Sequence, residues 1–137
     1  MTSYWLIIAI ILGGFFTLLN NKRKFVNHFY KNLSNDQLAK ETMLILNKIL
    51  KLHNKESYFT YTKIDSYTDL EDIISKYNEL LSKKNFKTIF DLRNEFAPTG
   101  LFQELSIQNG WTEAYKELLY KFGIIHNIFC ERLKNTS

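Results

Sequence analysis

Apolar residues recur at intervals of three and four along most of the chain after residue 33, with polar and charged residues between them. This spacing places the apolar side chains on one face of an α-helix and therefore predicts amphipathic helices. Glycine and proline are scarce, which argues against a β-sandwich with its many turns. The sequence thus predicts an all-α fold, in which residues 34–137 form a small helical bundle. The expected helices are about five, over residues 34–53, 66–81, 86–96, 101–107 and 112–133.

Capping residues indicate where three of these helices begin. Ser34 and Gln37 have the spacing of a capping box, in which each side chain bonds the backbone N–H of the other residue. Ser66 or Thr68 is expected to cap the next helix, because a hydroxyl can accept a bond from the first turn. Thr112 is expected to cap the last helix for the same reason.

The segment Ser57–Asp65 (SYFTYTKID) is the one place where aromatic and β-branched residues suggest a strand. An isolated strand has no partner with which to form a sheet. We therefore expect an extended connection there, or a small hairpin.

The chain begins with an uncharged apolar run over residues 4–19 (YWLIIAIILGGFFTLL). As a helix this run spans ~24 Å at ~1.5 Å per residue, and its neighbours extend it to the ~30 Å of a bilayer core. A cleaved signal peptide would need a basic start, which this run lacks. Residues 1–21 therefore predict an uncleaved transmembrane helix, and the alternative is a buried N-terminal core helix.

A cluster of basic residues follows this run and precedes the first acidic residue, Asp36. Basic flanks stay on the cytoplasmic side of a membrane. We therefore expect a single-pass protein of the inner (cell) membrane, with its N-terminus outside and residues 34–137 in the cytoplasm. The members of this membrane-proximal basic cluster are Lys22, Arg23, Lys24 and Lys31.

Residues 22–33 (KRKFVNHFYKNL) carry apolar side chains at helical spacing among these basic residues. One interpretation is an amphipathic helix held on the membrane surface by anionic lipid. The other is the first core helix of the following domain. Both interpretations need the same apolar stripe, and the sequence does not separate them.

The net charge of +4 comes entirely from the basic cluster, because the other 14 basic residues are matched by 14 acidic residues. Residues 35–137 therefore carry no excess positive charge with which to bind a phosphate backbone. Fifteen of the 18 basic residues are lysine, and arginine is the better residue for bidentate phosphate recognition. We expect no nucleic-acid partner.

Residues that could perform chemistry are scattered. His126 and Cys130 share a helix face, yet a zinc site would need further ligands that the sequence does not offer. The chain has no sequence motif of a hydrolase, a nucleotide-binding loop or a metalloprotease. Asp91, Arg93 and Glu95 lie within about one helix turn and are typical of a solvated face. The sequence therefore predicts no enzyme, no metal site and no cofactor.

The segment Phe96–Trp111 (FAPTGLFQELSIQNGW) holds the single proline, two of five glycines and one of two tryptophans. These residues have a structural explanation, since Pro98 and Gly100 break one helix and Gly110 ends the next. Trp111 is either a buried packing residue or an exposed contact residue, and we expect the buried one. The second interpretation is a partner-binding surface made of Gln103, Gln108, Asn109 and Trp111.

The residues Phe96-Ala97-Pro98-Thr99-Gly100, followed by Gln103-Glu104 and Asn109-Gly110-Trp111, resemble a pattern in small uncharacterised bacterial helical domains. Some domains of that sort are immunity proteins encoded near secreted toxins. The resemblance covers residues 96–111 alone. It implies a protein that binds another protein, without indicating which toxin.

These observations together predict a single-pass, membrane-anchored protein-binding module. Its most concrete form is a bacterial immunity or exclusion protein that binds and neutralises a toxin. A membrane anchor suits that role, because it concentrates the binder where a toxin enters. The alternatives are a structural or adaptor subunit of a membrane protein complex and, third, an enzyme with an unrecognised site. The expected partners are the lipid bilayer and another protein.

Overall fold

The computed structural model describes residues 21–135 of the chain. It divides the chain into two compact units, residues 1–32 and residues 33–137. In the first unit, residues 21–31 are helical. The transmembrane helix predicted over residues 1–21 lies, except for its last residue, outside the described residues. Of the helices that are described, none combines the length and the apolar character needed to cross a membrane.

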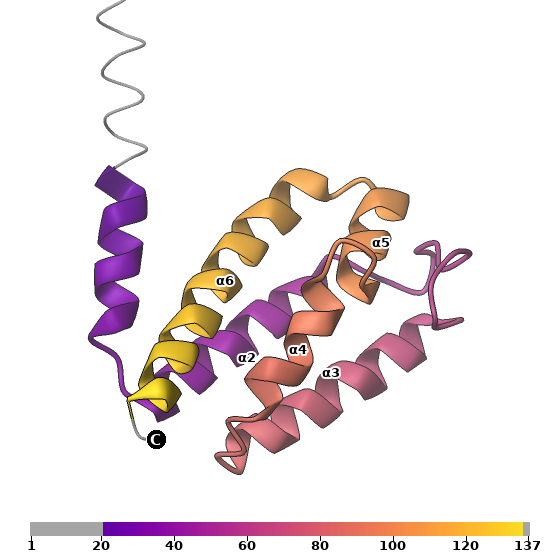
Figure 1. Cartoon of the computed structure of the whole chain (residues 1–137). Helices are drawn as coiled ribbons and strands as arrows, with labels where there is room; N and C mark the ends of the chain where they lie inside the picture. The colour runs from indigo at the N-terminus through magenta and orange to yellow at the C-terminus, as the bar shows by residue number, and fades with distance from the viewer. Residues whose placement is uncertain (1–20, 136–137) are drawn as a thin grey trace, which may run out of the picture. The chain divides into compact units, whose positions relative to one another are not determined.

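The second unit is all-α, as the sequence predicts. Within residues 33–135 the structure has no strand, and residues 58–65 run as turns and irregular backbone instead of a hairpin. Figure 1 shows the helices, which are α2 (Asn35–Lys51), α3 (Tyr67–Ser82), α4 (Thr88–Phe96), α5 (Leu101–Asn109) and α6 (Thr112–Lys134).

The predicted start of α2 is confirmed in atomic detail. The backbone N–H of Gln37 donates to the Ser34 hydroxyl at 3.2 Å, and the Ser34 N–H donates to the Gln37 side chain at 2.9 Å. For α3 the capping residue is Ser66, whose hydroxyl accepts from the Asp69 N–H at 3.2 Å. The alternative cap, Thr68, lies inside the helix.

The prediction that Thr112 caps α6 is wrong. Thr112 is the first residue of the helix, and Trp111 occupies the capping position without a side-chain bond to the helix backbone. The reason lies in Gly110, which ends α5 in the left-handed region at φ 75°. That conformation, which glycine adopts at little cost, turns the chain so sharply that only Gly110 and Trp111 separate the two helices.

The core of the second unit lies between α2 and the other helices. α2 packs against α3 and α6, and both α4 and α5 pack against α6 (Figure 1). Phe96, at the end of α4, stacks on Phe122 of α6 with ring centroids 4.2 Å apart. Arg132, near the end of α6, donates to the Leu33 carbonyl at 2.7 Å and to Asn35 at 2.6 Å. These bonds join the two ends of the unit. The most deeply buried large side chains are Leu38, Leu46, Ile49, Leu70, Ile74, Ile89, Leu92, Phe102, Leu105, Tyr115, Ile125 and Phe129.

Connections between the later helices are short, but α2 and α3 are joined by residues 52–66. We call this segment the α2–α3 loop. Connections of more than about 12–15 residues without secondary structure are uncommon in compact domains, and they are usually either functional or disordered. The α2–α3 loop is held in place by many contacts and runs beside α5 (Figure 1).

Candidate functional site

The α2–α3 loop begins with a turn that its own side chains stabilise. The Asn54 side chain accepts from the Glu56 N–H at 2.8 Å, which is an Asx turn. The Ser57 hydroxyl accepts from the Asn54 N–H at 3.0 Å, and the Ser57 N–H donates to the Asn54 carbonyl at 3.1 Å. The first turn of the loop therefore has a defined backbone conformation.

Asn109, the last residue of α5, holds the middle of the loop. Its side-chain oxygen accepts from the Tyr58 N–H at 2.7 Å, and its side-chain NH2 donates to the Tyr58 carbonyl at 3.0 Å. The same NH2 donates to the Leu105 carbonyl at 3.0 Å. One amide thus satisfies both backbone groups of Tyr58 while it is fixed to its own helix.

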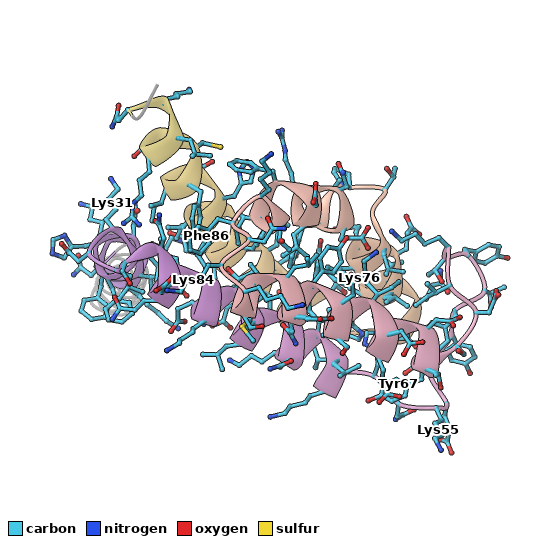
Figure 2. The ribbon with its side chains drawn as sticks, turned by 90° about the horizontal axis from the view of Figure 1, so that it is seen from below. Lys31, Lys55, Tyr67, Lys76, Lys84 and Phe86 are labelled. Carbon is cyan, nitrogen blue, oxygen red and sulfur yellow. The ribbon has the colours of Figure 1, made fainter. Side chains whose placement is uncertain are left out.

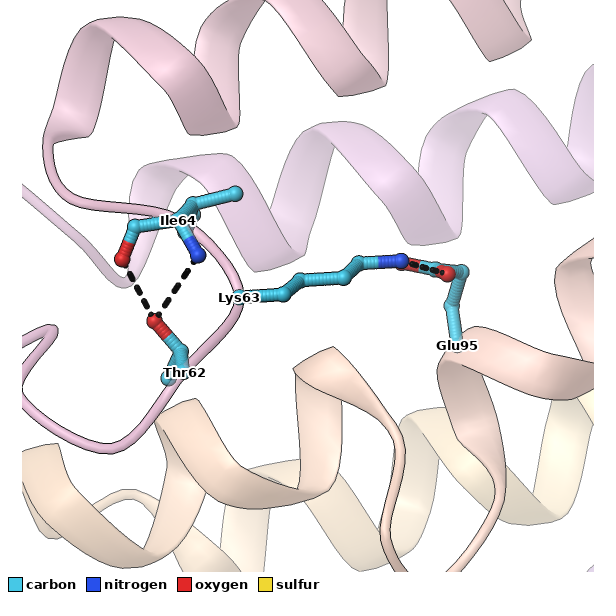
Figure 3. A network of polar contacts seen from close by, with 4 residues as sticks. All are labelled: Thr62, Lys63, Ile64 and Glu95. Atoms are coloured by element: carbon cyan, nitrogen blue, oxygen red, sulfur yellow. Dashed lines mark hydrogen bonds and ion pairs between the residues drawn. The ribbon is translucent and has the colours of Figure 1, made fainter.

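The end of the loop is fixed by a short polar network and one buried side chain (Figure 3). The Thr62 hydroxyl donates to the Ile64 carbonyl at 2.8 Å and accepts from the Ile64 N–H at 3.4 Å. The Ile64 side chain is buried. Lys63, between them, forms an ion pair with Glu95 of α4.

Between these fixed points, two aromatic side chains project into solvent. Tyr58 is 68% exposed and Tyr61 is 82% exposed. Exposed tyrosines on a backbone fixed by hydrogen bonds are typical of protein contact surfaces, because they offer a large contact area and lose few rotamers on binding. Lys55 of the loop and Tyr67, the first residue of α3, lie together at one end of the second unit (Figure 2).

At the start of the loop, His53 forms a buried pair with Trp111. The Trp111 indole N–H donates to His53 Nε2 at 3.1 Å, and His53 Nδ1–H donates to the Ile49 carbonyl at 2.9 Å. The bond from Trp111 requires a neutral imidazole, since Nε2 acts as its acceptor. Burial lowers the pKa of His53, and this effect exceeds the opposing effect of the Ile49 carbonyl.

The residues that the sequence indicated for partner binding do not form one exposed surface. Trp111 is 8% exposed and is a packing residue, as we expected of the two alternatives. Asn109 is half-buried against the loop, and Gln103 is half-buried on α5. The side-chain Nε2 and Oε1 atoms of Gln108 are buried without a hydrogen-bond partner in the structure. Asn109 and Trp111 therefore position the loop from below.

The basic cluster lies on the helix over residues 21–31, in the first unit. Lys22, Arg23, Lys24 and Lys31 are all exposed. On the same helix, the rings of Phe25 and Phe29 are 68% and 47% exposed and stack at 6.4 Å. Exposed aromatic and basic side chains on one helix are typical of a membrane-surface helix.

One acidic residue differs from the solvated face that the sequence suggests. Asp91 and Arg93 are exposed, but the side chain of Glu95 is only 6% exposed. The face of α4 that carries Glu95 is covered by the end of the α2–α3 loop, which supplies Lys63 as its counter-charge. A buried carboxylate needs such a partner.

His126 and Cys130 lie side by side on α6, with Sγ 3.8 Å from Nδ1. Burial and the Arg93 charge lower the pKa of His126, while a bond to Asn127 opposes this. Within residues 21–135, no three histidine, cysteine or acidic side chains come together as a metal site would require.

Sequence reasoning missed Tyr58, Tyr61 and the Lys63–Glu95 pair. The available signal was the long interval between two helical stripes, filled with aromatic residues. No protein-family model, curated protein or solved structure matches the chain.

Proposed function

We propose that this protein is a protein-binding module, and that the α2–α3 loop contacts the partner through Tyr58 and Tyr61. The observation that carries the proposal is the exposure of both rings on a loop whose backbone is fixed by Asn109 and Thr62. A fixed loop loses little conformational entropy when it binds, so more of the contact energy appears as affinity.

We further propose that residues 1–21 tether the module to the inner membrane, with the second unit in the cytoplasm. The uncharged run before three consecutive basic residues supports this topology. The exposed basic and aromatic side chains on residues 21–31 suit a helix next to an anionic lipid surface. A tether raises the local concentration of the module at the membrane without any additional contact to the partner.

The most concrete form of this proposal is an immunity or exclusion protein that binds a toxin at the membrane. The resemblance over residues 96–111 supports it, because that segment includes Asn109 and Trp111, which position the loop. An adaptor subunit of a membrane complex would use the same surface, and the identity of the bound protein separates the two roles.

Affinity capture with the full chain tests the proposal. The double variant Tyr58→Ser/Tyr61→Ser is expected to lose at least about tenfold in captured partner, since aromatic contact residues often contribute ~2 kcal/mol or more each. Tyr120→Ser, on α6, is the matched control, because Tyr120 is a tyrosine 39% exposed and remote in sequence from the loop.

Three outcomes have distinct meanings. A captured toxin domain supports the immunity role, and resident membrane subunits support the adaptor role. Equal capture by wild type and the double variant, with loss in Tyr120→Ser, would show that the loop is not the contact surface.

A further inference from the structure

The ion pair between Lys63 and Glu95 is asymmetric. The Glu95 side chain is 6% exposed, whereas that of Lys63 is 57% exposed. Figure 3 shows Lys63 extended from the α2–α3 loop to Glu95 on α4. The ammonium group donates to Oε1 of the carboxylate, and the other oxygen, Oε2, is buried with no hydrogen-bond partner in the structure. The ion pair therefore leaves one of the two carboxylate oxygens without a hydrogen bond. A buried carboxylate oxygen in that state is destabilising.

A pocket of about 210 Å³ lies beside this carboxylate. Lys63, Glu95 and Glu104 line it, and the highly exposed Tyr61 forms part of its wall. This volume exceeds the ~30 Å³ of a single water molecule several times, so the pocket can admit a small side-chain head group. Gly100 fixes one wall, since it packs so closely on α4 that a Cβ would lie 2.3 Å from the Asn94 carbonyl oxygen.

The charges around the pocket favour a cation. The lining holds two acidic residues, Glu95 and Glu104, and one basic residue, Lys63. Nearby carboxylates also act on the Tyr77 hydroxyl group of α3. Its pKa is raised to about 12, first by burial and then by the charges of Glu95 and Asp91. A neutral or anionic ligand would gain nothing from this field.

The unused oxygen points to a guanidinium group in preference to a second ammonium. A guanidinium donates two parallel N–H bonds and can satisfy both oxygens of one carboxylate, whereas an ammonium acts as a point charge. Its planar face also stacks on aromatic rings, and Tyr61 offers one at the pocket.

We propose that this pocket binds the guanidinium group of an arginine side chain presented by the partner protein, which displaces Lys63 from Glu95. The proposal rests on the protein-binding function proposed above, and it specifies the chemistry of the partner. In the unbound protein Lys63 occupies this place, and because its side chain is 57% exposed, its ammonium group can return to water when the arginine enters.

A titration of the full chain followed by amide NMR tests the pocket without any partner. The probe is N-acetyl-arginine methylamide, and the control probe is the citrulline analogue, which has the same shape and no charge. We expect the arginine probe to shift the amide signals of Lys63 and Gly100 saturably, and to bind at least about tenfold more tightly than the citrulline probe.

Three variants sharpen the test. Glu95→Gln keeps the shape of the side chain and is expected to weaken arginine binding at least about tenfold. Lys63→Gln removes the competing cation from an exposed loop position and is expected to tighten binding. Glu113→Gln, at an exposed acidic residue of α6 outside the pocket lining, is the matched control and is expected to bind as wild type does.

Lys63→Gln is expected to raise the affinity for the arginine probe, whereas Glu95→Gln is expected to lower it. The Lys63→Gln result therefore tests the proposal even if Glu95→Gln folds poorly. Equal binding of the two probes, no saturable shift with either probe, or unchanged binding in Lys63→Gln overturns the proposal.

A competition experiment then separates a partner's arginine from a free guanidinium compound. A photo-crosslinker at position 61 reports partner contact, and saturating arginine probe is expected to lower the yield of the adduct. If the adduct forms equally with and without a probe that binds, the arginine proposal fails while the protein-binding function stands. If the NMR titration succeeds and no adduct forms at all, the protein-binding function fails, and with it the assignment of the arginine to a partner.

Discussion

The contact between Asn109 and Tyr58 makes a quantitative prediction. Replacing Asn109 with alanine removes three hydrogen bonds, two to the Tyr58 backbone and one to the Leu105 carbonyl. Each is worth about 0.5–1.5 kcal/mol net. Because Tyr58 is exposed, its freed N–H and carbonyl regain water, so we expect a total near the lower end, about 1.5–2 kcal/mol.

Thermal unfolding measures this loss, and amide hydrogen exchange locates it. For a chain of this size we expect the Tm to fall by roughly 5–10 °C. The Tyr58 amide is expected to lose its protection from exchange before the amides of α2 or α6 do, because the loop opens locally. Asn85→Ala, at an exposed amide on the turn before α4, is the control and is expected to change the Tm little.

The variant Asn109→Asp tests the geometry itself. A carboxylate keeps the acceptor for the Tyr58 N–H but replaces the donor with an oxygen that faces the carbonyls of Tyr58 and Leu105. We expect it to be at least as destabilising as Asn109→Ala. If Asn109→Asp has wild-type stability and Tyr58 stays protected, the side chain does not hold the loop in this way.

Three further predictions concern the fold and the topology. Gly100→Ala is expected to destabilise the protein by about 1–3 kcal/mol, because its Cβ would meet the Asn94 carbonyl at 2.3 Å. Gly123→Ala, with open space around it in α6, is expected to stabilise the protein by ~1 kcal/mol. Chemical denaturation measures both changes. Burial lowers the pKa of His53 below its ordinary 6.5, so the unfolded chain binds more protons there below about pH 6.5. The contribution of neutral His53 to the free energy of unfolding is therefore complete above that pH. It is lost as the pH falls toward the pKa of His53 in the folded protein. We expect Tm to drop less on acidification in His53→Gln than in wild type, and equal slopes would refute the assignment. A reporter active only in the periplasm is expected to stay inactive when fused after Ser137, and activity there would reverse the proposed topology.

Those parts of the fold that depend on neighbouring residues could be predicted from the sequence. The capping box at Ser34 and Gln37 involves residues three apart, and the end of α5 at Gly110 follows from the freedom of glycine. The cap of α6 was wrong by one position, since the sharp turn at Gly110 left Trp111 in the place expected for Thr112.

The candidate site was harder to predict, because its contacts join residues far apart in the chain. Asn109 lies 51 positions from Tyr58, and Glu95 lies 32 positions from Lys63. From the sequence alone, a carboxylate among polar residues of a helix is expected to be exposed. The residues next to Glu95 in the chain do not indicate that the α2–α3 loop covers it. Likewise, the exposure of Tyr58 and Tyr61 depends on how the loop is held.

Site-specific photo-crosslinking in the native cell tests the central claim most directly. A photoreactive phenylalanine analogue is placed in turn at positions 58, 61 and 120 of the full chain, and adducts are identified by mass spectrometry. The account predicts one protein adduct shared by positions 58 and 61 and absent from position 120. An adduct formed at position 120 alone, with none at 58 or 61, would contradict the assignment of the α2–α3 loop as the contact surface.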